Sequence, residues 1–222
     1  MKIAVIAAMD KEMQLLLPLM SDQRTVTVND FTFYTGKIDG NEIVAVKTGI
    51  GKVNAAIGAL TLIDTFHPSI VINTGVAGGT GAARILDVVI PDGIGYHDVW
   101  CGPGTVPGQA DGCPQLFPCP LPADMVETLG VRRGILATGD IFVSTPAQVE
   151  HILELYPEAV AVDMESGAIA QVCMLKSVPF VALKVISDTP GSGENISQYN
   201  NFWNDAPERT FSTLRSLLAA LT

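Results

Sequence analysis

The chain has 222 residues with a formal net charge of −10, and 48% of its residues are hydrophobic against 16% charged. This composition supports a sizeable core and argues against disorder. The acidic balance argues against nucleic acid as a partner, because phosphate contacts need a basic surface. We expect one α/β domain over residues 1–222.

The N-terminal half shows strand and helix patterns in alternation. Four runs have the apolar or alternating pattern of strands, at residues 2–8, 25–37, 42–48 and 69–73. Helical spacing follows the first run until Pro18 interrupts it, and small residues after Gly51 predict a helix that packs closely on a sheet. The glycine-rich segment 74–81 matches neither a dinucleotide-binding motif nor a P-loop. We expect a loop there that approaches a ligand closely.

The C-terminal half combines a long irregular segment with further strands and helices. Residues 101–122 are rich in proline, glycine and cysteine, and predict an ordered loop that covers part of the molecule. Strands are expected at residues 85–91, 134–138, 160–163 and 180–188. Helices are expected at residues 146–155, after residue 165, and at about 205–221. A mixed sheet with helices on both faces follows.

Two acids lie where predicted strands end. An apolar run from Val160 is broken by Asp163 and Glu165 and continues as a helix, and the run 180–188 ends in Asp188. Ligands bind at the carboxyl ends of strands in open α/β sheets. Glu165 and Asp188 therefore predict a site there. The alternative is that Glu165 only caps its helix, where the free N–H groups favour negative charge.

The cysteines and histidines give no metal-binding pattern. The four cysteines form no C-x-x-C pair and the three histidines are scattered, so neither a metal nor a cofactor is expected. Reduced thiols and a cytoplasmic location are the simplest interpretation. The apolar opening is cut off at Asp10, so we expect neither a secretory segment nor a membrane span.

Glu12, just beyond the first strand, joins Glu165 and Asp188 as a third acid near a strand end. The chain has no Gly-x-Ser-x-Gly elbow, so acyl transfer by a serine is poorly supported. Paired carboxylates without a metal fit cleavage of a glycosidic bond through an oxocarbenium-like state. One acid protonates the leaving group, one activates water, and a third stabilises the cationic sugar.

Seven short motifs, taken together, carry a specific resemblance. They are Ala8-Met9-Asp-Lys-Glu12, Thr48-Gly-Ile-Gly-Lys-Val53, Asn73-Thr-Gly-Val-Ala-Gly-Gly79, Tyr96-His-Asp98, Gly139-Asp140, Val162-Asp-Met-Glu165 and Ile186-Ser-Asp188. Through them the chain resembles the 5'-methylthioadenosine/S-adenosylhomocysteine nucleosidases of the nucleoside phosphorylase superfamily over nearly its whole length. The resemblance implies a three-layer α/β/α sandwich with a mixed sheet, a homodimer, and hydrolysis that releases adenine.

The resemblance also implies a role for each acid. Glu12 matches the residue that activates the attacking water, and Asp188 matches the acid that protonates the purine N7. Glu165 matches the residue that binds ribose hydroxyls and supports the developing positive charge. His97-Asp98 is interpreted as structural, and Lys52 as a solvated or helix-dipole lysine.

Further positions match residues that contact the nucleoside. Phe142 would stack on adenine, the backbone of Val143 would read the adenine edge, and Met164 would lie against the sugar. The remaining positions are Met9, Ile50 and Tyr199 around the sugar and the 5'-alkylthio group, Ala77 and Gly78 along the purine, and Ser187 beside Asp188.

Three positions depart from the family pattern. Val76 stands where many relatives carry a small hydroxyl residue, and Lys184 where many carry an arginine near the ribose and the water. Lysine cannot reproduce a bidentate guanidinium. Asp111 replaces a proline in the irregular segment, which leaves the preferred 5' substituent open.

Three alternative functions are compatible with the fold that the resemblance implies. A phosphorylase of the same fold needs cationic groups for phosphate, whereas the segment after the first strand offers Asp10 and Glu12. A hydrolase acting on 6-amino-6-deoxyfutalosine stays open. A non-catalytic adenosine-binding module is the third, although binding alone does not require both a proton donor and a water base.

Overall fold

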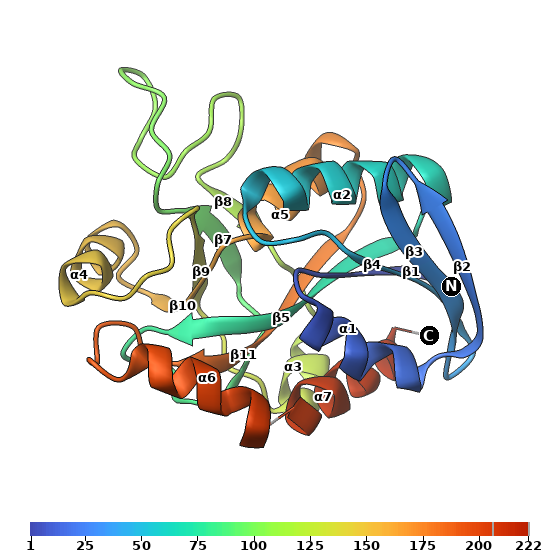
Figure 1. Ribbon diagram of the computed structural model, residues 1–222. Helices are drawn as coiled ribbons and strands as arrows, with labels where there is room; N and C mark the ends of the chain where they lie inside the picture. The colour runs from blue at the N-terminus through green and yellow to red at the C-terminus, as the bar shows by residue number, and fades with distance from the viewer. Residues whose placement is uncertain (206, 222) are drawn as a thin grey trace.

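One mixed β-sheet, with helices on both faces, organises the part of the chain that the computed structural model describes, residues 1–205 and 207–221 (Figure 1). Its path runs β2-β3-β4-β1-β5-β10-β9-β7-β8, while β11 pairs with β5 and β6. The strands are β1 Lys2–Ala7, β2 Ser21–Val28, β3 Phe31–Ile38, β4 Asn41–Lys47, β5 Ile70–Gly79, β6 Val88–Val89, β7 Gly93–Tyr96, β8 Leu116–Pro118, β9 Ile135–Thr138, β10 Ala159–Asp163 and β11 Phe180–Asp188.

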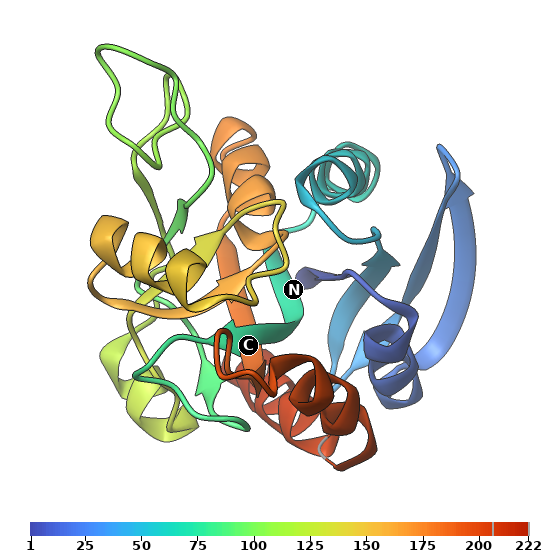
Figure 2. The same ribbon diagram turned by 60° about the vertical axis from the view of Figure 1, so that its left-hand side comes forward.

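The helices form a layer on each face of the sheet. Helices α2 and α5 lie side by side on one face, and α1, α3, α6 and α7 lie on the other (Figures 1 and 2). Their bounds are α1 Asp10–Leu16, α2 Lys52–Phe66, α3 Ala123–Leu129, α4 Pro146–Leu155, α5 Ser166–Leu175, α6 Asn195–Asp205 and α7 Pro207–Ala220, with a 3₁₀ turn at Leu17–Leu19. The predicted α/β/α architecture is confirmed.

The centre of the sheet consists of the parallel strands β1, β5 and β11. All nine residues of β11 are buried, as are five of the six in β1. Because helices cover both faces, these strands need apolar residues on both sides, and their sequences are continuous apolar runs. The shared parallel direction brings the carboxyl ends of β1 and β11 and the second half of β5 to one region.

The predicted strand at residues 25–37 is wrong, because this segment forms a hairpin. Strands β2 and β3 pair in antiparallel fashion around Asn29 and Asp30, whose φ angles are +48° and +64°. Two consecutive residues with positive φ form the tight turn that suits a two-residue hairpin, and Asn and Asp tolerate this conformation. The alternating pattern continued across the turn and concealed it.

The glycine-rich segment 74–81, predicted as a loop, is mostly strand and forms the second half of β5. Strand β5 continues through Gly79, and Gly78 and Gly79 pair with Val162 and Ala161 of β10. A Cβ at Gly78 would lie 3.1 Å from the side chain of Val162, and one at Gly79 would lie 2.9 Å from the Ala83 carbonyl oxygen. Glycine is needed here for close packing between neighbouring segments.

Other boundaries differ from the predictions. Of the strand expected at residues 85–91, two residues form β6. The final helix begins at Pro207, α6 precedes it unpredicted, and residue 206 lies outside the described residues. The irregular segment packs on the core through Cys113 and Phe117, whereas its tip projects outward and Trp100 is exposed (Figures 1 and 2).

Candidate active site

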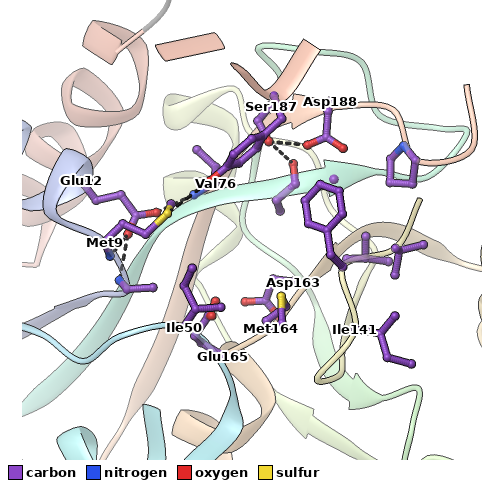
Figure 3. A pocket seen from close by; sticks show the side chains of 18 residues that line it. Met9, Glu12, Ile50, Val76, Ile141, Asp163, Met164, Glu165, Ser187 and Asp188 are labelled. Carbon is purple, nitrogen blue, oxygen red and sulfur yellow. Dashed lines mark hydrogen bonds between the residues drawn. The ribbon is translucent and has the colours of Figure 1, made fainter. Parts of the chain in front are cut away.

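Glu12, Glu165 and Asp188 line one pocket, although the sequence separates them widely (Figure 3). Glu12 lies on the first turn of α1, Glu165 immediately precedes α5, and Asp188 ends β11. Their exposed fractions are 3%, 6% and 3%. Three nearly buried carboxyl groups from three elements therefore share one cavity.

The pocket encloses about 610 Å³ of space, including its open mouth. All the residues predicted from the sequence line it, namely Met9, Glu12, Ile50, Ala77, Gly78, Phe142, Val143, Met164, Glu165, Ser187, Asp188 and Tyr199. The sequence did not predict a further group of lining residues, which comprises Ala8, Val76, Ile141, Val162, Asp163 and Pro190. Most of these adjoin a predicted residue in the chain.

Backbone amides hold the carboxylate of Glu12. The N–H groups of Ala8 and Met9 donate to Oε2 at 2.8 and 2.9 Å, and the N–H of Val76 donates to Oε1 at 3.2 Å. Burial raises the pKa of Glu12, while Lys184 and these three amides oppose the rise. The side chain is thus fixed as a proton acceptor whose pKa lies above its usual range.

Glu165 occupies the N-cap position of α5, but its side chain does not cap that helix. Its Oε1 instead accepts a hydrogen bond of 2.9 Å from the N–H of Gly51, the N-cap residue of α2. Asp163 caps α5, since its Oδ2 accepts from the N–H of Ser166 at 3.0 Å. Burial raises the pKa of Glu165 to about 7, against the opposing effect of Lys184. The alternative that Glu165 is only a helix cap is wrong.

Asp188 is held by two side-chain donors. The hydroxyl of Ser187 donates to Oδ1 at 2.6 Å, and Nδ2 of Asn195 donates to Oδ2 at 2.9 Å. Burial raises the pKa of Asp188, and both hydrogen bonds work against the rise. A raised pKa suits a carboxyl group that must donate a proton. Asn195 begins α6, and no motif in the sequence pointed to it.

Asp163 and Lys184 form a buried ion pair beside the pocket. Nζ of Lys184 lies 3.0 Å from Oδ2 of Asp163, and the two side chains are 2% and 1% exposed. The hydroxyl of Thr138 donates to the other oxygen, Oδ1, at 2.6 Å. Burial disfavours the charged forms of both groups, but the ion pair and its hydrogen bonds favour these forms more strongly. The pKa of Asp163 is therefore lowered and that of Lys184 is raised. Lys184 thus supplies positive charge that acts on Glu12 and Glu165, two of the three pocket acids.

Aromatic side chains form the rim of the pocket. The rings of Phe142 and Tyr199 meet edge to face, with centroids 5.9 Å apart and an interplanar angle of 78°. The Tyr199 hydroxyl donates to Sδ of Met9 at 3.2 Å. Phe142 is 46% exposed. This leaves a ring face available to a flat apolar ligand.

Within residues 1–205 and 207–221, no group of three or more His, Cys, Asp or Glu side chains could hold a metal ion. In the same residues no helix is both long enough and apolar enough to cross a bilayer.

Comparison with known proteins shows the family of the chain. Residues 2–219 match the model of the phosphorylase superfamily. The 5'-methylthioadenosine/S-adenosylhomocysteine nucleosidase of Geobacillus thermodenitrificans (strain NG80-2) is 38% identical, over 100% of this chain and 98% of the relative. The chain belongs to the 5'-methylthioadenosine/S-adenosylhomocysteine nucleosidase family.

Solved members of the family have the same fold. The S-adenosylhomocysteine nucleosidase of Streptococcus pyogenes, in complex with 5-methylthiotubericidin, gives a TM-score of 0.93 at 32% identity, over 100% of this chain and 98% of that one. The nucleosidase of Colwellia psychrerythraea 34H, in complex with adenine, gives 0.92 at 31% identity, over 100% and 96%. The predicted family and fold are both confirmed.

Proposed function

We propose that this protein hydrolyses the N-glycosidic bond of 5'-methylthioadenosine and S-adenosylhomocysteine and releases adenine. The observation that carries the proposal is the convergence of Glu12, Glu165 and Asp188 on one pocket beside the ring of Phe142. Full-length relatives with this activity in their names support it. The placement of the acids supports the same chemistry.

Asp188 acts as the general acid. Its proton passes to N7 of the purine, and the electron pair of the C1'–N9 bond moves to the base, so that neutral adenine leaves. Burial keeps the pKa of Asp188 raised and so favours the protonated donor. The sugar left behind carries positive charge spread over C1' and the ring oxygen.

Glu165 and Glu12 complete the hydrolysis. Glu165 binds ribose hydroxyls and, as a carboxylate, stabilises the cationic sugar. Glu12 takes one proton from a water molecule, whose oxygen bonds to C1' and gives the 5'-thioribose product. One water is consumed for each adenine released. General acid and base steps contribute roughly 10²–10⁴-fold each.

The remaining predicted residues bind the nucleoside. The base lies between Phe142 and the β5 backbone at Ala77 and Gly78, and the backbone of Val143 reads its edge. Met164 contacts the sugar. Met9, Ile50 and Tyr199 surround the 5'-alkylthio group, and Ser187 orients Asp188. In this arrangement the apolar surface of the 5'-alkylthio group contacts apolar side chains of the pocket.

The pocket disfavours the phosphorylase alternative. Of the described residues that line it, none is lysine or arginine, whereas binding of a phosphate dianion needs such groups. The buried Lys184 is already paired with Asp163. Water is therefore the better nucleophile for this site.

We also propose that residues 1–222 form one domain and that two copies of the chain form a homodimer through α2. Val53, Ile57 and Leu60 form an apolar stripe at helical spacing on α2 and are 68%, 50% and 43% exposed. The exposed Trp100, which directly precedes the projecting irregular segment, adds apolar surface. The four free thiols favour a reducing compartment, and we propose a cytoplasmic location.

The test is adenine release from 5'-methylthioadenosine, S-adenosylhomocysteine and 6-amino-6-deoxyfutalosine, each with and without phosphate. Phosphate-independent adenine release from the two thioadenosines, lost in Glu12→Gln and Asp188→Asn, is the expected result. Strict phosphate dependence identifies a phosphorylase, and a preference for the futalosine substrate identifies that hydrolase. Binding without turnover of any substrate identifies the non-catalytic module and overturns the proposal.

A further inference from the structure

Lys52 and Asp98 form an ion pair that the proposed chemistry does not use. Nζ of Lys52, in the first turn of α2, lies 2.8 Å from both carboxylate oxygens of Asp98, which follows β7. The two side chains are 21% and 16% exposed, so the pair is largely withdrawn from solvent. Lys52, interpreted from the sequence as a solvated or helix-dipole lysine, is therefore ion-paired and only partly exposed.

Asp140 closes this pair into a three-residue cluster. Its N–H donates to Oδ2 of Asp98 at 2.8 Å, and its Oδ1 accepts from the N–H of Lys52 at 2.7 Å. The Lys52–Asp98–Asp140 cluster thus ties together three segments: the start of α2, the end of β7 and the loop after β9. Each of the three residues contacts the other two.

The surrounding backbone is fitted closely to this cluster. Gly51 has a φ of +96°, and a Cβ there would lie 3.0 Å from Oδ1 of Asp140. At Gly139 a Cβ would lie 2.9 Å from Cγ of Asp98 and closer still to the ring of His97. The ammonium of Lys52 lies 5.3 Å from the ring centroid of Tyr96, within cation–π range.

Two connections lead from the cluster into the pocket. Gly51, the residue before Lys52, donates its N–H to Oε1 of Glu165 at 2.9 Å. Asp140 directly precedes Ile141, Phe142 and Val143, which line the pocket. The cluster residues themselves are absent from the described pocket lining, so they act on the pocket through these neighbours.

We propose that Asp98 is a positioning residue, which through Lys52 and Asp140 holds the Glu165 end and the Phe142 end of the pocket in their relative places. This proposal rests on the proposed function for its kinetic part. Neutralising Asp98 leaves the ammonium of Lys52 without its counter-ion in a partly desolvated place, so the start of α2 and the loop after β9 lose their common anchor. A displacement of about 1 Å at reacting groups can cost about 10²-fold in rate.

Loss of the anchor also has a pH signature. The N–H of Gly51 and Lys184 on β11 favour the carboxylate form of Glu165, while Asp163 on β10 and Glu12 on α1 oppose it. If the N–H of Gly51 moves away, the pKa of Glu165 rises. The acid limb of kcat/KM then moves to higher pH, a change that general destabilisation of the fold does not produce.

The variants are Asp98→Asn, Lys52→Met, Lys52→Arg and the double variant Asp98→Asn/Lys52→Met. Asp39→Asn is the control. Asp39 also forms a two-contact ion pair, in which Nε and Nη2 of Arg215 lie 2.8 Å from its two carboxylate oxygens. It precedes β4 and does not line the pocket. The readouts are kcat and KM for 5'-methylthioadenosine from pH 5 to 9, the Kd of adenine by calorimetry, and Tm.

We expect Asp98→Asn and Lys52→Met each to lower kcat by about 10–10²-fold and to move the acid limb upward, with weaker adenine binding. Lys52→Arg retains the charge and restores most of kcat. The double variant is no worse than the poorer single variant, because both remove one interaction. Asp39→Asn leaves the pH profile and the adenine Kd unchanged.

Two results overturn the proposal. The first is that Asp98→Asn has the same pH profile of kcat/KM and the same adenine Kd as Asp39→Asn. The second is that the losses of kcat in the two single variants add up fully in the double variant. The adenine measurement separates the two proposals. An inactive wild-type protein whose adenine binding still weakens in Asp98→Asn contradicts the proposed function while supporting the positioning role. If Asp98→Asn does not fold, Lys52→Met tests the same pair from its other side.

Discussion

The α-carbon of Gly75 lies so close to Glu12 that a Cβ on this residue would displace the Glu12 side chain. A Cβ at this position would lie 2.9 Å from Cδ of Glu12 and closer still to Oε1. The next residue, Val76, donates its N–H to that same oxygen at 3.2 Å. Strand β5 therefore presses against the side chain of Glu12 and fixes its carboxylate.

Gly75→Ala is expected to displace Glu12 and to lower kcat by at least about 10²-fold, since the base would no longer meet the water. Gly75 also has a φ of +149°, so some strain accompanies the clash. Gly40→Ala is the control, because Gly40 has a φ of +89° but a Cβ added there would have no atom within 4 Å. Equal activities of the two variants would contradict this account of Gly75.

The acid limb of kcat/KM should lie near neutrality. Burial raises the pKa of Glu165 to about 7, and it also raises that of Glu12. Both groups act as carboxylates in the proposed chemistry, so activity falls as the pH drops and each carboxylate takes up a proton. Glu165→Gln should lower activity. It should also make the acid limb of kcat/KM shallower, because one of the two carboxyl groups that produce this limb is gone. A wild-type limb near the ordinary glutamate pKa of 4.5 would count against this assignment.

Asn195→Ala should move the basic limb of kcat/KM to higher pH. Nδ2 of Asn195 donates to Oδ2 of Asp188, and this bond lowers the pKa of that carboxyl. Without the donor the pKa rises, so Asp188 keeps its proton to a higher pH. Gln198→Ala is the control, since Gln198 lies on the same helix and accepts instead from the N–H of Thr189. A basic limb that shifts downward, or equally in both variants, would refute the role given to Asn195.

Lys184→Met should destabilise the fold by about 3–5 kcal/mol, because it leaves Asp163 charged, buried and without its counter-ion. The free energy of unfolding in urea at pH 7 measures this loss. Lys176→Met removes a partly exposed pair with Asp64 and should cost about 1 kcal/mol or less. The pKa of Asp163 is lowered in the folded protein, so its stabilising contribution is present at neutral pH and is lost as the pH falls through the folded pKa. The loss of unfolding free energy caused by Lys184→Met should therefore approach that caused by Lys176→Met as the pH falls.

Local patterns were sufficient for the elements that are uniformly buried. Strands β1 and β11 are apolar over nearly their whole length, and their predicted ranges agree with the structure within one residue. Patterns failed where a short turn or a change of partner was involved. The turn at Asn29 and Asp30 left the alternation of β2 and β3 uninterrupted, and the glycines at the end of β5 concealed a strand.

The sequence by itself determined the family, the α/β layering and most of the residues that line the pocket, because motifs and buried apolar runs are local properties of the chain. Only the tertiary structure decided what holds these residues. Three contacts join segments that are distant in sequence or lie across a turn. They are the hydrogen bond from Asn195 to Asp188, the hydrogen bond from Gly51 to Glu165, and the ion pair of Lys184 with Asp163. Such contacts depend on which strand ends and helix starts meet in space, and that is set by the packing of the whole sheet.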